Sequence, residues 1–161
     1  MESPRVLIAN LLPEAQICVG LPGATKGDVL AALLGVLATN SSVLDAEAMH
    51  TAVLAREAMM STGVGKGLAL PHAKTEAVRE TVAAFAITAE PIDYDALDGE
   101  SVRLMFLLVG PQTIKTQHIR ILSRISRLLN RDAFRAEVLA ATDAAHVHRL
   151  LMDAELDLLA H

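Results

Sequence analysis

The sequence predicts an α/β fold, a three-layer α/β/α sandwich whose middle layer is a mixed β-sheet. Short apolar runs are accompanied by longer segments with helical periodicity on both sides of them in the chain. Two of the apolar runs lack polar alternation, which is expected of strands covered on both faces. With 161 residues, 52% of them hydrophobic, the chain can bury a sizeable core, and it has no linker-like segment. We therefore predict a single domain over residues 1–161.

The first part of the chain contains one predicted strand and two predicted helices. The run "QICVGL", residues 16–21, has the length and composition of a strand. Thr25 and Asp28 have the spacing of a capping box, with Asp in place of the usual Glu, so a helix is expected to begin there and to run to about Thr39. A second helix is expected over residues 44–60, before a glycine-rich turn.

The second part of the chain alternates strands and turns and then becomes helical. Apolar runs at residues 67–72 ("GLALPH"), 81–89 and 102–109 predict strands, and the Asp98-Gly99 pair marks a turn between the last two. Three helices are expected after Pro111, over residues 116–129, 132–141 and 143–159.

Composition argues against several classes of protein. Only 2% of the residues are aromatic and the net charge is −5, so binding to nucleic acid is disfavoured. The lone Cys18 excludes an internal disulfide and a cysteine metal site. Neither a signal-peptide core nor an apolar window of about 18 residues is present, which predicts a cytoplasmic protein that does not insert into a membrane.

The segment "STGVGKGLALPHAK", residues 61–74, concentrates glycines before a proline and a histidine. A phosphate-binding P-loop needs Ser or Thr after Gly-Lys, but Gly67 follows Lys66, and Met60 stands where the first glycine should be. A dinucleotide fingerprint needs G-x-G-x-x-G after a strand, whereas these glycines are spaced G-x-G-x-G after a helix. The segment is better explained as a sharp helix-to-strand turn that presents His72 where a strand leaves the sheet.

The histidines do not have the spacing of a metal site, and no metal or cofactor is expected. His118 lies on the same predicted helix face as Leu122, Ile125 and Leu129, so it should face the protein body from the first turn. It is either a half-buried structural histidine or part of an anion site at the helix N-terminus. The opposite face forms a basic stripe, solvated or facing an acidic partner, that comprises Arg120, Arg124, Arg127 and Arg131.

Three segments together resemble a known family. They are "REAMMSTGVGKGLALPHAK", "AITAEPIDYDALDGESVRLMFLLVGP" and "HIRILSRISRLL". They are similar to the type-2 EIIA domain (fructose/mannitol class) of the sugar phosphotransferase system (PTS). The length of the chain is most like that of the stand-alone nitrogen-regulatory IIA protein.

The resemblance implies a site and a function. His72 matches the histidine that accepts a phosphoryl group, on Nε2, from the phosphocarrier protein HPr. Arg56 and His118 match the arginine and the second histidine of the active site. The residues expected to contact the phosphate through the turn are Ser61, Thr62, Gly63 and Gly65. Lys66 replaces a small polar residue common in relatives and is expected to add a positive charge near the phosphate.

Three functions are compatible with this resemblance. The leading hypothesis is a phosphotransferase component that carries phosphohistidine and regulates partner proteins, such as a transporter or a kinase, by its phosphorylation state. The second is a sugar-specific IIA component that passes phosphate to a IIB component. The third is a binding module that no longer exchanges phosphate, against which the retained Arg56, His72 and His118 argue.

Overall fold

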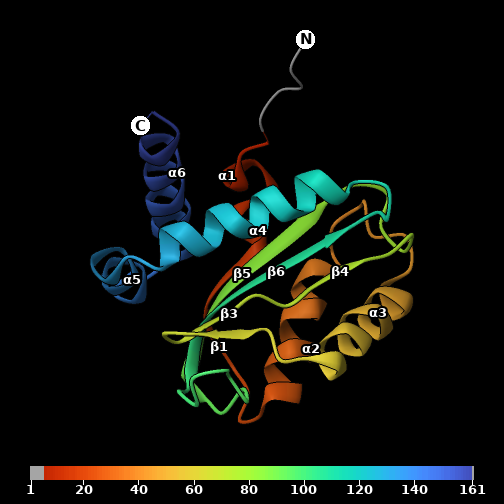
Figure 1. The fold of residues 1–161 in the computed structure, drawn as a ribbon, viewed down its shortest axis with the longest axis horizontal. Helices are drawn as coiled ribbons and strands as arrows, with labels where there is room; N and C mark the ends of the chain where they lie inside the picture. Colours follow the sequence, from red (N-terminus) through yellow and green to blue (C-terminus); the bar gives the residue numbers. More distant parts are fainter. Residues whose placement is uncertain (1–5, 161) are drawn as a thin grey trace.

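A mixed sheet of six strands forms the middle layer of the protein, in a computed structural model that describes residues 6–160 (Figure 1). Residues 1–5 and 161 of the predicted domain lie outside the described residues. The strand order is β1-β5-β6-β3-β2, and β4 pairs with β6 beyond the end of β3. The strands are β1 Ile17–Leu21, β2 Gly63–Gly65, β3 Leu68–Ala69, β4 His72–Lys74, β5 Val82–Ile92 and β6 Val102–Gly110.

Helices cover both faces of this sheet, which confirms the predicted α/β/α architecture. One face packs on α2 (Lys26–Leu37) and α3 (Ala46–Met59) through a core of aliphatic side chains. The other face packs on α4 (Lys115–Leu129), as Figure 1 shows, together with α1 (Ile8–Leu11), α5 (Asp132–Leu139) and α6 (Ala144–Ala160). The helix α1 was not predicted, because four residues carry too little periodicity to be recognised.

The helix α2 begins as the sequence predicted. The Thr25 side chain accepts a hydrogen bond from the backbone N–H of Asp28, and the Asp28 carboxylate accepts one from the backbone N–H of Thr25. These two bonds form a capping box with Asp in the place of Glu, and they satisfy N–H groups that would otherwise lack partners at the helix start. Hydrogen bonds from the backbone N–H groups of Ala24 and Thr25, and from the Thr25 side chain, hold the pKa of the exposed Asp28 carboxyl below its usual value.

The predicted strand over residues 67–72 is divided into two pieces. Both β3 and β4 run parallel to β6, with Leu68 opposite Leu104 and His72 opposite Leu108. Between the pieces, Pro71 cannot donate to the ladder because it has no N–H, although its carbonyl accepts a hydrogen bond from the N–H of Leu108 at 3.0 Å. The break places His72 at the start of a separate strand on the edge of the sheet.

A buried carboxylate joins the two ends of the described chain. Glu155 in α6 is fully buried and accepts hydrogen bonds from the backbone N–H of Ile8 at 2.8 Å and of Ala9 at 3.4 Å. Arg124 of α4 forms a salt bridge with it at 2.9 Å and also donates to the carbonyl of Val6. Glu155 therefore fixes α1, α4 and α6 to one another.

Candidate functional site

Two histidines from distant parts of the chain meet at the edge of the sheet. The ring centroids of His72 and His118 are 5.6 Å apart, and the ring planes are tilted by 58°. His72 is the first residue of β4, and its partner Leu108 belongs to the core on the α4 side of the sheet. Since paired residues of neighbouring strands point to the same face, the His72 side chain is directed toward α4. There His118 occupies the first turn and faces inward, as predicted.

The backbone fixes the tautomer of His72. Its Nδ1 lies 2.8 Å from the carbonyl oxygen of Leu70. A carbonyl oxygen can only accept a hydrogen bond, so Nδ1 carries the proton in the neutral ring. The lone pair then lies on Nε2, which makes Nε2 the nucleophilic atom of the neutral imidazole.

His118 is buried without a hydrogen-bonding partner. It is 4% exposed, and neither ring nitrogen has a partner among the described residues. Gly110 lies next to the ring: a Cβ at Gly110 would be in ordinary contact with Nδ1 of His118, at 3.5 Å, and would crowd Oγ1 of Thr81, at 3.1 Å. Buried polar atoms are normally hydrogen-bonded, so both ring nitrogens of His118 have capacity for a polar partner beside His72.

Burial keeps His118 neutral. It lowers the pKa of His118 to about 4, and the positive charges of His72 and Lys74 act in the same direction. The pKa of His72 is lowered as well, mainly by burial and further by the positive charges of Arg56 and Lys74. The hydrogen bond to Leu70 and the negative charge of Glu57 partly oppose this shift. Both imidazoles are therefore neutral at pH 7, and a neutral imidazole has one nitrogen with a lone pair that can act as a nucleophile and one N–H that can donate a hydrogen bond.

The depressed pKa of His118 predicts that acid destabilises the fold. Between pH 6.5 and pH 4 the unfolded chain protonates this residue and the folded protein does not, so stability decreases as the pH falls through this range. The free energy of unfolding should decrease by about 2 kcal/mol from pH 7 to pH 5 on account of His118. Urea unfolding at these two pH values measures it. The variant His118→Gln should lose this part of the pH dependence, and an unchanged dependence would contradict the assignment.

Arg56 lies at the end of α3, next to the pair. Its Nη1 donates to the carbonyl of Met60 at 3.0 Å, beyond the last turn of the helix. Its positive charge is close enough to lower the pKa of His72. The ion pair that Arg56 could have formed with Glu57 is not present, because Glu57 pairs with Lys26 at 2.8 Å.

Glu57 anchors the glycine-rich turn to α3. Its buried carboxylate accepts hydrogen bonds from the backbone N–H of Thr62 at 2.9 Å and from the Thr62 hydroxyl at 2.5 Å. The Thr62 hydroxyl also lies 3.3 Å from the Tyr94 hydroxyl, and Lys26 lies over the Tyr94 ring, 4.5 Å from its centroid. This cluster fixes the path of the chain between Arg56 and β2.

The four predicted phosphate-binding residues of the turn have partners inside the protein. Thr62 is bound to Glu57, and the Ser61 hydroxyl donates to the carbonyl of Tyr94 and accepts from the N–H of Gly63. A Cβ at Gly63 would lie 2.8 Å from Ala96, and Gly65, the last residue of β2, has a φ of 109°. Phosphate binding by these residues stays a prediction, and their contacts favour a structural role.

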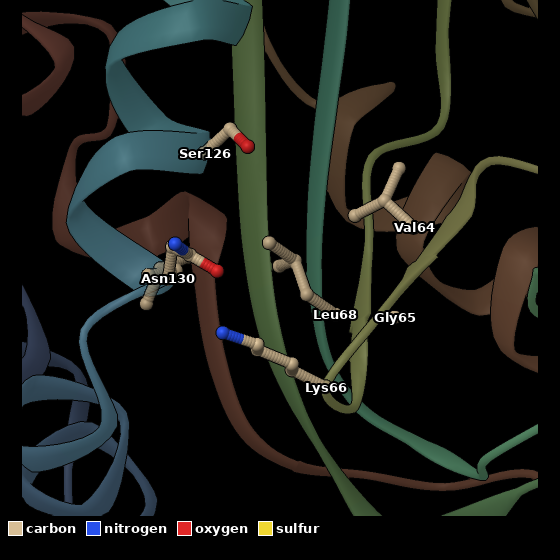
Figure 2. A pocket seen from close by; sticks show the side chains of 7 residues that line it. Val64, Gly65, Lys66, Leu68, Ser126 and Asn130 are labelled. Atoms are coloured by element: carbon tan, nitrogen blue, oxygen red, sulfur yellow. The ribbon is translucent and has the colours of Figure 1, made fainter. Parts of the chain in front are cut away.

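The prediction for Lys66 is wrong. Its side chain points toward Asn130, at the C-terminal end of α4, in a surface cleft that Leu68 and Ser126 also line (Figure 2). His118 is twelve residues before Asn130 in the sequence, about 18 Å along this helix. The β2–β3 turn carries Lys66 away from the histidines, so its charge does not reach a phosphate there.

The predicted basic stripe is interrupted at Arg124. Three of its arginines are exposed, but Arg124 turns inward to Glu155 and the carbonyl of Val6. The spacing of the arginines could not reveal that Arg124 turns inward, because its partner Glu155 lies in another helix. On the apolar face, Ile121 is fully buried and Leu122 only partly, so the buried stripe lies slightly to one side of the predicted one.

Sequence reasoning missed three features of the site, Lys74, the Leu70 carbonyl and Gly110. Lys74 lies two residues after His72, and strand periodicity would have placed both side chains on one face. The carbonyl of Leu70 and the small Gly110 are backbone features with no side-chain signal to find. Within residues 6–160, no group of three or more His, Cys, Asp or Glu is arranged to hold a metal ion.

Comparison with known proteins identifies the family. A sequence model described as "Phosphoenolpyruvate-dependent sugar phosphotransferase system, EIIA 2" matches residues 10–154. The chain belongs to this family. As a PTS EIIA domain it is a component of a phosphotransfer system, which confirms the resemblance seen in the sequence.

Relatives from both branches of the EIIA family cover nearly the whole chain. A fructose-specific EIIA component from Haloferax volcanii is 36% identical, over 91% of this chain and 95% of the relative. A nitrogen regulatory protein from Pseudomonas aeruginosa is 29% identical, over 93% of this chain and 97% of the relative. The crystal structure of the nitrogen regulatory protein IIA-Ntr from Neisseria meningitidis superposes with a TM-score of 0.84 at 28% identity, over 89% and 98% of the two chains.

The helices of this EIIA domain are short or polar. Among the described residues, none is both long enough and apolar enough to cross a bilayer. The longest, α6 (Ala144–Ala160), has 17 residues and contains charged side chains.

Proposed function

We propose that this EIIA domain carries a phosphoryl group on Nε2 of His72, which it accepts from an HPr-type phosphocarrier. The observation that carries the proposal is the hydrogen bond between Nδ1 and the Leu70 carbonyl, which leaves the Nε2 lone pair free. His118, with no partner on either nitrogen, lies beside it. Arg56 supplies a positive charge from the end of α3.

The chemical step needs only positioning and charge. The Nε2 lone pair attacks phosphorus, the N–P bond of the donor phosphohistidine breaks, and its electron pair stays on the donor nitrogen. The Nδ1 proton remains on the hydrogen bond to Leu70, so the phosphorylated ring is held in the same orientation. His118 donates a hydrogen bond to a phosphoryl oxygen, and the guanidinium of Arg56 pairs with the phosphoryl charge.

The phosphorylated protein then has two candidate uses. The structural similarity to IIA-Ntr supports the leading proposal, regulation of partner proteins by phosphorylation state. The 36% identity to a fructose-specific EIIA component supports the alternative, transfer to a IIB component in sugar uptake. A solved complex of enzyme IIA-mannitol with phosphorylated enzyme IIB-mannitol has the same fold, with a TM-score of 0.74.

Incubation of the protein with phosphoenolpyruvate, Enzyme I and HPr tests the carrier proposal. We expect an acid-labile, base-stable phosphate on the protein, because phosphate bound to nitrogen has this stability pattern. Absence of label with a cognate HPr would contradict the proposal and favour a binding module. Adding a fructose-type IIB to the labelled protein separates the two uses: rapid transfer indicates sugar uptake, and retention of the label indicates regulation.

A further inference from the structure

Lys74 follows His72 on the same strand and faces the same side of the sheet. The two residues are opposite Leu108 and Gly110 of β6. Leu108 lies in the core on the α4 side, and Gly110 is next to the His118 ring. Ala73, between them, packs into the core on the other side. Strand alternation therefore directs the side chains of both His72 and Lys74 toward α4.

The spacing lets Lys74 reach the reacting atom. Alternate residues of a strand are separated by about 6.6 Å, and an extended lysine side chain covers about that distance from its Cα atom to Nζ, whereas a histidine side chain is shorter. A phosphoryl group on Nε2 of His72 would lie between the two side chains. Lys74 is exposed, so its ammonium group can turn toward such a group without leaving a buried position.

Two cationic side chains act on the histidines, Arg56 and Lys74. A phosphoryl group brings about two negative charges. His118 is neutral at pH 7 and supplies a hydrogen bond but no charge, as described above. Glu57 belongs to the same neighbourhood, and its negative charge is compensated by Lys26. The remaining positive charges that act on the histidine pair are Arg56 from α3 and Lys74 from β4.

We propose that Lys74 contacts the phosphoryl group on His72 and that Arg56 and Lys74 together neutralise it. The inference rests on the proposed carrier function and adds a second cation to its site. During transfer, the phosphoryl group moves from the nitrogen of the donor phosphohistidine to Nε2 of His72. The ammonium group of Lys74 stays protonated and exchanges no atom. The ammonium group attracts the phosphoryl oxygens electrostatically, and this attraction is strongest when the phosphoryl group is at Nε2.

The rate of phosphoryl transfer from phosphorylated HPr to three variants of the full chain tests the inference. Lys74→Gln should slow transfer by about tenfold or more, since loss of one stabilising group at a reacting phosphoryl costs at least that. Lys74→Arg should recover most of the rate because it keeps the charge. Lys66→Gln is the matched control, since Lys66 lies near the other end of α4, and it should leave the rate unchanged.

The pKa values of the two histidines provide a second readout, which needs no phosphate. In the unphosphorylated protein, Lys74→Gln should raise the pKa of His72 and of His118 in an NMR titration, because a nearby positive charge is removed. Two outcomes would overturn the inference while the carrier function stands, provided that the wild type is labelled. In the first, Lys74→Gln accepts phosphate at the wild-type rate; in the second, the transfer rate falls equally in Lys74→Arg and Lys74→Gln. An unlabelled wild type would overturn the carrier function and the inference with it.

Discussion

Replacement of His72 by alanine is expected to abolish phosphorylation by HPr. The variant lacks Nε2, and no other described side chain combines a free imidazole lone pair with the charges of Arg56 and Lys74. His118 cannot take over, because it is buried and its position is fixed by α4. The measurement is the label on the protein after incubation with phosphoenolpyruvate, Enzyme I and HPr.

Two controls make this result specific. His146→Ala removes a histidine of α6 and should be labelled like the wild type. Thermal unfolding of His72→Ala should show an intact fold, because His72 is only partly buried and its single described hydrogen bond is to the backbone. Equal labelling of His72→Ala and the wild type would place the acceptor on another residue.

Replacement of Glu155 by alanine is expected to destabilise the fold strongly. The variant leaves the half-buried Arg124 without its carboxylate and the N–H groups of Ile8 and Ala9 without an acceptor. Removal of one partner of a buried ion pair typically costs about 3–5 kcal/mol. Urea unfolding at pH 7 measures this loss.

The comparison with an exposed glutamate isolates the effect of burial. Glu137→Ala in α5 removes a carboxylate at an exposed position and should change the free energy of unfolding by less than about 0.5 kcal/mol. If Glu155→Ala were as stable as Glu137→Ala, Glu155 would not be what holds α1, α4 and α6 together.

Local sequence signals predicted most of the elements but not their interruptions. The capping box at Thr25 and Asp28 is a pattern within four residues, and the structure contains it as predicted. The apolar runs that became β5 and β6 were recognisable because both faces of these strands are buried. The break at Pro71 and the short α1 depend on pairing with β6 and on Glu155, which are contacts between distant residues.

In the candidate site, too, local signals predicted residues but not the contacts between distant parts of the chain. Periodicity placed His118 on the inward face of its helix, and the family resemblance joined it to His72 and Arg56, but neither could give their distance. The errors at Lys66 and Arg124 both depend on contacts between distant parts of the chain: the β2–β3 turn places Lys66 beside the C-terminal end of α4, and Arg124 turns to Glu155 of α6. Lys74 was missed although its spacing from His72 is a strand signal.

In the proposed carrier function the two histidines, one partly buried and one buried, meet an anion. Burial keeps both rings neutral, so neither needs to lose a proton before His72 reacts. Under the proposed function, neutralisation of the phosphate would depend on the nearby cations Arg56 and Lys74, while the hydrogen bond to the Leu70 carbonyl holds the His72 ring. The backbone thus fixes which nitrogen of His72 carries the lone pair.

The most direct test of the central claim is to locate the phosphate by NMR on protein labelled with ¹⁵N-histidine and phosphorylated by HPr. We expect a phosphorus–nitrogen coupling at Nε2 of His72, with Nδ1 still carrying the proton that it donates to the Leu70 carbonyl. Phosphate on Nδ1 of His72, or on any other residue, would contradict this claim.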